Sequence, residues 1–314
     1  MSSSVLYDVP GPRAILRNRI IGVITVLVVV AIAAFLVWRL AVTGQFSAEK
    51  WNAFTYTRIW EQFALAAGRT LAAFALAAVG ALALGFVLAI GRLSEHAWIR
   101  WPFTVVIEFM RAVPVLVMMF LLYYGLPVIG IRMEGYWVVV IALVAYNGSV
   151  LAEVIRAGVE SLPRGQKEAG YAIGLRKSGV MRLILLPQAI RAMMPVILAQ
   201  LVVTLKDTAL GFIITYEELL FYAKFLGAQN GLERPIVQAT IVAGAIYIAL
   251  CLALSGIARL VEKRMNRVPR VSGGAPTRPL SETTDTELIA AQTATDGATG
   301  NEGGGFAGFQ RRGR

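Results

Sequence analysis

The sequence predicts an all-α membrane protein with about six transmembrane helices. The chain is 57% hydrophobic and only 16% charged, whereas a soluble domain carries about 25% charged residues. Five charge-free runs are also long enough to cross the roughly 20-residue apolar core of a bilayer. They lie between Arg19 and Arg39, Arg69 and Arg92, Arg111 and Arg132, Glu134 and Glu153, and Arg234 and Arg259. These runs are apolar all round, which excludes the alternating pattern of a transmembrane barrel.

The N-terminal part is predicted to contain a basic cytoplasmic arm over residues 1–19 and an extra transmembrane helix over 20–42. The next loop, 43–62, is rich in aromatic residues, so we expect it at the outer membrane–water interface. A second helix is expected over 64–91. Its many alanines and glycines would let neighbouring helices approach closely in lipid.

Residues 92–111 are expected to return along the inner surface. The remaining spans are predicted over 112–127, 136–154, 191–216 and 235–260. The fifth span contains Lys206 and Asp207, and charges inside a membrane segment are costly and often functional. From residue 268 to 314 the composition is rich in Gly, Thr and acidic residues, which predicts a disordered cytoplasmic tail.

The distribution of the basic residues predicts the topology. The net charge of +11 is compatible with a nucleic-acid binder, but most Lys and Arg gather in alternate loops of the six-helix arrangement. Because cytoplasmic loops carry an excess of basic residues, both termini are expected in the cytoplasm. We therefore predict a multi-pass protein of the cytoplasmic membrane whose partner is lipid and not nucleic acid.

The longest inside segment, 160–190, reads as two short helices joined at a glycine. An amphipathic, basic helix–Gly–helix element on the inner face suits docking to a soluble partner. The expected boundary residues are Ser161 and Ser178 as helix caps, Pro163 at an early helical position, Gly174 as a left-handed terminator, and Pro187 at the far end.

The spacing within this segment resembles the EAA motif of ABC importer permeases. Glu168-Ala169-Gly170 is followed after three residues by Gly174, and then by Ile184 and Leu186-Pro187. In that family the element is the coupling helix, which sits in a cleft of the ATP-binding subunit. The resemblance implies a coupling segment over 160–187 with docking residues Gly165, Gln166, Glu168, Ala169, Gly170, Gly174, Leu186 and Pro187. Gly170 stands where alanine is usual, and since glycine costs about 1 kcal/mol inside a helix, slightly looser docking is expected.

The flanking motifs are similar to those of the polar amino acid permeases, the HisMQ-type branch. They are Arg111-x-x-Pro114, Glu153-x-x-Arg156-x-Gly158 and Pro163-x-Gly165-Gln166. The resemblance covers residues 60–262 and implies a MetI-like ABC permease core of five helices, to which this chain adds one N-terminal helix. The added helix and the long tail resemble glutamate permease subunits.

Five residues are candidates for structural or gating roles: Arg111, Pro114, Asn147, Glu153 and Arg156. Glu153 and Arg156 are three positions apart on a predicted helix, so they are expected to form an ion pair at the inner boundary. Asn147 is expected to form a hydrogen bond across helices.

A polar stripe on the fifth span supplies the candidates for the substrate pathway: Gln200, Thr204, Lys206, Asp207 and Thr208. A zwitterionic amino acid carries both charges, which side chains such as Lys206 and Asp207 would complement. The alternative interpretation is structural. In that case Lys206 reaches to the outer interface and Asp207 caps a break in the helix.

The resemblance implies a transport subunit and not an enzyme. The sequence contains no Gly-x-x-x-x-Gly-Lys-[Ser/Thr] phosphate loop, so ATP-Mg is expected to be used by a separate ATP-binding subunit, and no cofactor or metal is expected on this chain. The other implied partners are a second permease subunit, identical or related, and an extracytoplasmic amino-acid-binding protein. The expected cargo is a polar amino acid, L-glutamate or L-aspartate. An ion-coupled secondary transporter that uses Asp207 remains the alternative.

Overall fold

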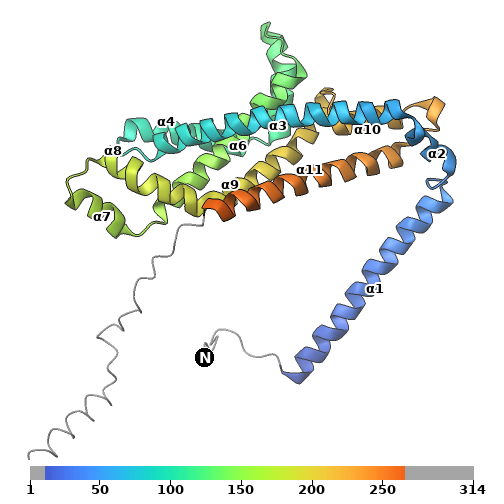
Figure 1. The fold of residues 1–314 in the computed structure, drawn as a ribbon, viewed down its shortest axis with the longest axis horizontal. Helices are drawn as coiled ribbons and strands as arrows, with labels where there is room; N and C mark the ends of the chain where they lie inside the picture. The colour runs from blue at the N-terminus through green and yellow to red at the C-terminus, as the bar shows by residue number, and fades with distance from the viewer. Residues whose placement is uncertain (1–10, 266–314) are drawn as a thin grey trace, which may run out of the picture. The chain divides into compact units, whose positions relative to one another are not determined.

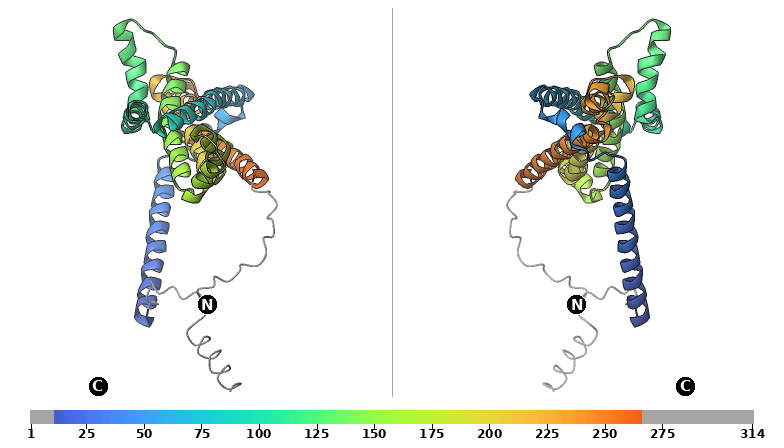
Figure 2. Two further views of the ribbon diagram at one scale, coloured as in Figure 1. Left: turned by 90° about the vertical axis from the view of Figure 1, so that its left-hand side faces the viewer. Right: turned by 90° about the vertical axis from the view of Figure 1, so that its right-hand side faces the viewer.

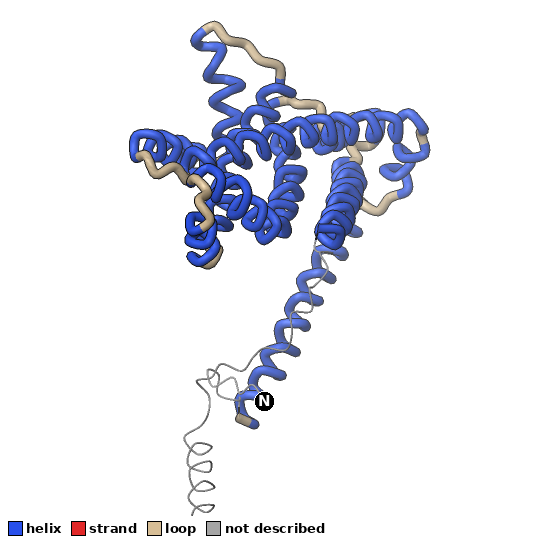
Figure 3. Tube along the Cα trace, turned by 60° about the vertical axis from the view of Figure 1, so that its left-hand side comes forward, coloured by secondary structure: helices blue, strands red, loops and turns tan. Residues whose placement is uncertain are grey.

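The computed structural model describes residues 11–265, and within them every regular element is a helix (Figures 1 and 3). The α-helices are α1 (Pro12–Val42), α2 (Ala48–Asn52), α3 (Thr57–Arg92), α4 (Ala97–Ala112), α5 (Val115–Phe120), α6 (Gly135–Glu160), α7 (Arg164–Ala172), α8 (Lys177–Gly179), α9 (Leu186–Asp207), α10 (Leu219–Gly227) and α11 (Ile236–Met265). Shorter 3-10 or π turns are η1 (Ala53–Thr55), η2 (Leu121–Gly125), η3 (Leu126–Ile129), η4 (Val180–Leu185), η5 (Thr208–Ile214) and η6 (Asn230–Leu232). Residues 1–10 and the predicted tail 268–314 lie outside the described residues.

Within residues 11–265, five helical segments are long and apolar enough to cross a membrane: Arg13–Val42, Thr57–Arg92, Gly135–Glu160, Lys177–Ile214 and Ile236–Arg264. A sixth span results if α4 and the helical stretch Val115–Ile129 act together, although they bend by 95° at the break between them. The prediction of an all-α protein with about six membrane helices is therefore confirmed.

The first helix begins earlier than predicted. Pro12 occupies an early helical position after the extended Gly11, where proline is favoured because its missing N–H has no helical partner. Residues 12–19, which were expected to belong to the basic arm that precedes the helix, are therefore part of α1. None of the most apolar stretch of α1 is buried, so its apolar surface is left for lipid.

Helices α3, α6, α9 and α11 form the bundle seen in Figures 1 and 2. The most extensive contact is between α3 and α6, and it depends on glycine. A Cβ atom added to Gly85 would meet the backbone oxygen of Gly148 at 2.9 Å, and one added to Gly80 would meet Val144 Cγ2 at 2.6 Å. The expectation that small residues bring these helices together is confirmed.

The described part of the chain has four clusters of buried side chains, of which three are large. One joins α3, α5, α6 and η5 around Met119 and Leu143. A second joins α3, α4, α6 and η4 around Ile107 and Val180. The third joins α3, α10 and α11 around Phe63. Each cluster connects elements far apart in sequence, so the elements that contribute to the clusters pack against one another.

Two segments expected as connections contain packed helices. Residues 92–111 include α4, whose Ile107 is fully buried. The predicted outside loop 217–234 includes α10, whose apolar face packs against α3 and α11. The aromatic loop 43–62 also contains helical turns, and Trp60 Nε1 donates a hydrogen bond to the Phe54 carbonyl at 2.8 Å.

The fifth span is longer than predicted and starts earlier. Helical structure is continuous from Lys177 to Ile214, so the expected second short helix and the expected span 191–216 form one element. Pro187 does not end a helix, because it lies in the first turn of α9 directly after the π turn η4. Proline has no N–H group to donate to the preceding turn of a helix. Because the preceding turn η4 is a π turn, which already departs from the regular α-helical hydrogen-bond pattern, the helix continues past Pro187.

Candidate functional site

Helix α7 carries the central residues of the predicted coupling segment. It starts directly after Pro163, which is its N-cap. It ends in a Schellman motif, in which the Leu175 N–H donates to the Gly170 carbonyl at 3.2 Å and the Gly174 N–H donates to Tyr171 at 2.9 Å. Gly174 has a φ of +79°, which confirms the prediction that it terminates the helix in the left-handed conformation.

The two predicted serine caps are wrong. Ser161 Oγ donates to the Gly158 carbonyl at 2.9 Å, so it closes the end of α6 and does not cap α7. The N-cap of α8 is Arg176, and no side chain caps that helix. In both cases the chain has an extended residue at the boundary, and backbone geometry alone starts the next helix.

Gly170 sets how closely α7 lies against the start of the fifth span. A Cβ atom there would meet Val180 Cγ2 at 2.8 Å and Ile184 Cδ1 at 2.9 Å. On the neighbouring turn, Gln188 Nε2 donates to Gln166 Oε1 at 3.3 Å. Gly170 thus permits a close contact between α7 and η4. Alanine is usual at this position of the motif, and the sequence alone did not predict this packing role.

The predicted docking residues divide into an exposed and a buried set. Gly170 and Leu186 are buried, which gives them a supporting position under the segment. The exposed members are Gly165, Gln166, Glu168, Ala169, Gly174 and Pro187. The exposed set leaves much of α7 available to a partner, although contact with one remains a prediction.

Glu153 lies at the centre of an ionic cluster outside the coupling segment. Arg156 Nε donates to Glu153 Oε1 at 2.9 Å, which confirms the predicted pair. Arg92 Nη1 lies 3.0 Å from Glu153 Oε2, and Arg111 Nη1 lies 4.0 Å from the same atom. Arg92 also contacts Glu108 at 3.0 Å, so the cluster ties the ends of α3, α4 and α6 together.

Pro114 marks the sharp bend that follows Arg111. It is the N-cap of α5, and the chain turns by 95° between α4 and the stretch Val115–Ile129. A proline restricts the residue before it to extended conformations, and Val113 has an extended backbone with a ψ of 119°. The Arg-x-x-Pro pattern therefore places the arginine at the end of one helix and the proline at the start of the next.

The predicted hydrogen bond of Asn147 across helices is confirmed. Gln200 Nε2 on α9 donates to Asn147 Oδ1 on α6 at 2.8 Å, and Asn147 Nδ2 donates to the Leu143 carbonyl at 3.0 Å. Asn147 is fully buried. Gln200 was predicted to line the substrate pathway, and Asn147 was predicted to have a structural or gating role. The structure joins the two by this hydrogen bond.

The other residues of the predicted polar stripe are in varied surroundings. Thr204 and Thr208 are fully buried, and their hydroxyl groups donate to carbonyls of their own helix at 2.9 Å and 2.6 Å. Lys206 is exposed and Asp207 is partly exposed. Contact of any of them with substrate remains a prediction.

A buried polar cluster around Glu218 was missed by the sequence analysis. The carboxylate caps α10 by accepting hydrogen bonds from the N–H groups of Leu220 at 2.8 Å and Phe221 at 2.7 Å. The Tyr247 hydroxyl donates to the same carboxylate at 2.6 Å. An acidic residue directly before an apolar run is a helix-start signal, and it would have revealed α10 within the expected loop.

Candidate metal ligands do not gather in the part of the chain that the structure describes. Among residues 11–265, no group of three or more His, Cys, Asp or Glu side chains is placed to hold an ion. The polar side chains instead pair with one another or with backbone groups, as in the Glu153 and Glu218 clusters.

A bundle of candidate spans that presents a short, closely held helix beyond them is the architecture of a transport permease. The chain belongs to the family described as binding-protein-dependent transport system inner membrane components, whose model matches residues 81–267. Within this family it is a permease of the amino-acid ABC importers.

Its relatives include several amino-acid permeases. The chain is 37% identical over 227 residues to the glutamate transport system permease protein GluD of Corynebacterium glutamicum, covering 71% of this chain and 82% of the relative. It is 34% identical to the L-cystine transport system permease protein TcyB of Bacillus subtilis, covering 59% and 78%. A solved amino acid ABC transporter with histidines has a TM-score of 0.61 and 27% identity, covering 67% of this chain and 97% of that one.

Proposed function

We propose that this permease carries L-glutamate or L-aspartate across the cytoplasmic membrane, with both of its termini in the cytoplasm. ATP-Mg is bound and hydrolysed by a separate ATP-binding subunit that docks on residues 160–187, and this chain binds no cofactor. A second permease subunit completes the pathway, and an extracytoplasmic binding protein delivers the amino acid.

The position of α7 is the observation that carries this proposal. Its exposed side offers Gly165, Glu168 and Ala169, while Gly170 holds the opposite side against η4. Because η4 continues into α9 without a break, a push on α7 reaches the span that carries Gln200 directly. This arrangement suits a lever between a nucleotide-driven partner and the membrane.

The choice of cargo rests on two relatives. GluD is a glutamate permease, and a permease named for glutamate/aspartate import, GltK of Escherichia coli O6:H1, is 30% identical over 188 residues and covers 57% of this chain and 83% of its own length. The test is uptake of labelled glutamate by the assembled transporter in vesicles, with aspartate, glutamine, arginine and cystine as competitors. Competition by aspartate alone is the expected result, and preferred uptake of cystine or arginine would overturn the assignment.

The lever is tested at the end of α7. Gly174→Val forces a β-branched residue into the left-handed region, which costs about 1–2 kcal/mol, whereas Gly174→Asn is tolerated there. No neighbouring atom of this chain lies within 4 Å of a Cβ built at this position, so neither side chain clashes within the protein. Both variants add a side chain of similar size to the exposed surface, and they differ chiefly in backbone strain. We expect Gly174→Val to lose ATP-driven uptake while Gly174→Asn retains it.

Equal uptake by both Gly174 variants would count against the lever. The same vesicles test the energy source. Uptake that a protonophore abolishes, and that persists after the ATP-binding subunit is inactivated, would indicate an ion-coupled secondary transporter instead.

A further inference from the structure

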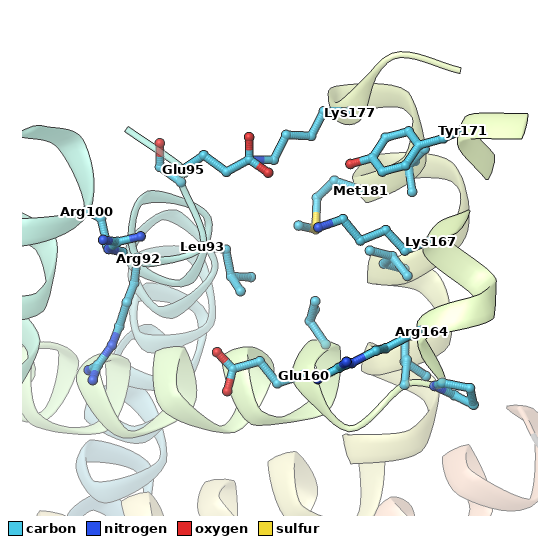
Figure 4. Close-up of a pocket in the computed structure, with 16 residues that line it drawn as sticks. Arg92, Leu93, Glu95, Arg100, Glu160, Arg164, Lys167, Tyr171, Lys177 and Met181 are labelled. Carbon is cyan, nitrogen blue, oxygen red and sulfur yellow. The ribbon is translucent and has the colours of Figure 1, made fainter. Parts of the chain in front are cut away.

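A basic pocket of about 340 Å³ opens where the ends of α3 and α6 meet α7 and α8 (Figure 4). Five basic and two acidic side chains line it. They are Arg92, Arg100, Arg164, Lys167 and Lys177, with Glu95 and Glu160. Figure 4 shows Arg164 and Lys167 on α7 extending into the space opposite Arg92 and Arg100.

Two of these basic residues are already neutralised within the protein. Arg92 contacts both Glu108 and Glu153. Lys177 Nζ lies 2.5 Å from Glu95 Oε1, and this hydrogen bond holds the pKa of Glu95 below its usual value, so the pair is ionised. The acidic Glu160 is paired with Arg156. Each carboxylate of the pocket therefore already has a directly paired cation.

Three cations of the basic pocket have no carboxylate partner within residues 11–265. Among those residues, no acidic group lies within ion-pair distance of Arg100, Arg164 or Lys167. Lys167 Nζ instead lies over the Tyr171 ring, 5.9 Å from its centre. Like charges gathered around one pocket repel one another, and a bound anion relieves that repulsion.

An apolar groove of about 650 Å³ adjoins the basic pocket. The two share Leu93, Ser94, Glu95, Lys177 and Met181. The apolar side chains of the groove include Phe86, Val87, Ile90, Ile99, Phe103 and Met181. Next to it on α4, Trp98 and Trp101 are 75% and 71% exposed, and tryptophan favours the level of the lipid headgroups.

We propose that the basic pocket binds the phosphate group of an acidic phospholipid whose acyl chain lies in the apolar groove. The charge of the pocket selects an anion, and the adjoining groove selects an anion that carries a hydrocarbon chain. A soluble phosphate or carboxylate would fill only the pocket. The inference rests on the proposed function in two respects: this end of the bundle lies at the cytoplasmic leaflet, and the ATP-binding subunit contacts α7 at Gly165, Glu168 and Ala169 while Arg164 and Lys167 face the pocket. It does not depend on the identity of the transported amino acid.

Lipid retention by the assembled transporter tests the headgroup. The purified complex is equilibrated with equal amounts of phosphatidylglycerol and phosphatidylcholine, and the bound lipids are counted by native mass spectrometry. Phosphatidylglycerol should be retained in preference. Arg100→Gln should weaken its retention about fivefold, which corresponds to about 1 kcal/mol. Arg100 lies outside the coupling segment, so the variant leaves the proposed docking residues intact.

The matched control is Arg264→Gln, because Arg264 is also exposed and lies on the same proposed side but does not line the pocket. It should bind phosphatidylglycerol as the wild type does. Equal retention of the two lipids, or an equal loss in both variants, would overturn the headgroup site.

The groove is tested with a pair of variants on α3. Ile90 lines the groove and Val79 does not, and both are exposed. Ile90→Asn should lower phosphatidylglycerol retention by at least about threefold, whereas Val79→Asn should not. Displacement of the lipid by glycerol phosphate or glutamate at the same concentration would instead assign the pocket to a small anion and contradict the proposal. None of these readouts depends on uptake, so a wrong assignment of the cargo would leave them unchanged.

Discussion

Gly170 shows how the absence of a side chain fixes the position of a helix. Its α-carbon faces Val180 and Ile184 at distances that leave no room for a Cβ atom. Elsewhere on α7, Gly165 has no neighbour within 4 Å of a Cβ position. The two glycines therefore differ in what a substitution would disturb, although they lie on the same short helix.

We expect Gly170→Leu to destabilise the protein by about 1–3 kcal/mol, because overpacking displaces α7 from η4. The apparent Tm in detergent should fall by about 2–4 °C per kcal/mol. Gly165→Leu serves as the control and should change the Tm little. Equal Tm values for both variants would show that α7 is not held at Gly170.

Glu218 gives a prediction for the pH dependence of stability. It lies outside the five candidate spans, and burial raises its pKa above the usual 4.5, against the hydrogen bonds that it accepts from Tyr247 and α10. A carboxyl group with a higher pKa in the folded chain binds its proton more tightly when folded. The free energy of unfolding therefore falls as the pH rises from about 4.5 through the raised pKa.

Glu218→Gln has no proton to lose, so its Tm should vary less with pH over this range than the Tm of the wild type. Thermal unfolding between about pH 4.5 and pH 8 measures the difference. Glu217→Gln is the control, since the Glu217 side chain is 60% exposed. A Tm profile for Glu218→Gln parallel to that of the wild type would contradict the prediction.

At the scale of elements, α6 and α9 are joined by the amide pair of Asn147 and Gln200. Asn147→Leu and Gln200→Leu each remove the interhelical hydrogen bond, and the double variant removes both of its partners. A double-mutant cycle of unfolding free energies should give a coupling of about 0.6–1.7 kcal/mol. A coupling near zero would mean that the two amides contribute independently.

The elements also show what the sequence predicts well and what it misses. Charge-free runs predict α1, α3, α6 and α11, because every helix that crosses a bilayer needs about 20 apolar residues of its own, whatever its neighbours are. The helix-start signal at Glu218 could have revealed α10 itself, whereas the packing of α10 against α3 and α11 is visible only in three dimensions. The join between α8 and α9 was missed for a local reason, since Pro187 suggests a break that the π turn of η4 accommodates.

In the candidate site, too, the sequence predicts contacts between residues close in the chain and misses contacts between distant ones. The left-handed Gly174 and the Glu153–Arg156 pair follow from local spacing, so the sequence predicts both. Arg92 as a partner of Glu153, Gln200 as a partner of Asn147, and the Glu218 cluster join residues distant in the chain. No short-range pattern contains that information.

For the whole molecule, the proposed orientation is testable with single cysteines. Cys251 is the one native cysteine, and Cys251→Ser removes it. In that background, Gln166→Cys on α7 should react with a membrane-impermeant thiol reagent only in inside-out vesicles. Arg132→Cys, in the connection between η3 and α6, should react only in intact cells. The reverse pattern would place α7 outside the cell and refute the docking proposal.

Because helical structure is continuous from Lys177 to Ile214, the number of residues in this segment fixes how its two ends are rotated relative to each other. Each residue of an α-helix turns the chain by about 100° and advances it by about 1.5 Å. A single residue inserted into the α-helical turns before Gln200 would rotate Gln200 away from Asn147, while the contact of α7 with η4 at the start of the segment stayed in place. The number of residues between α7 and Gln200 therefore matters as much as their identity, because it sets which way the Gln200 amide points.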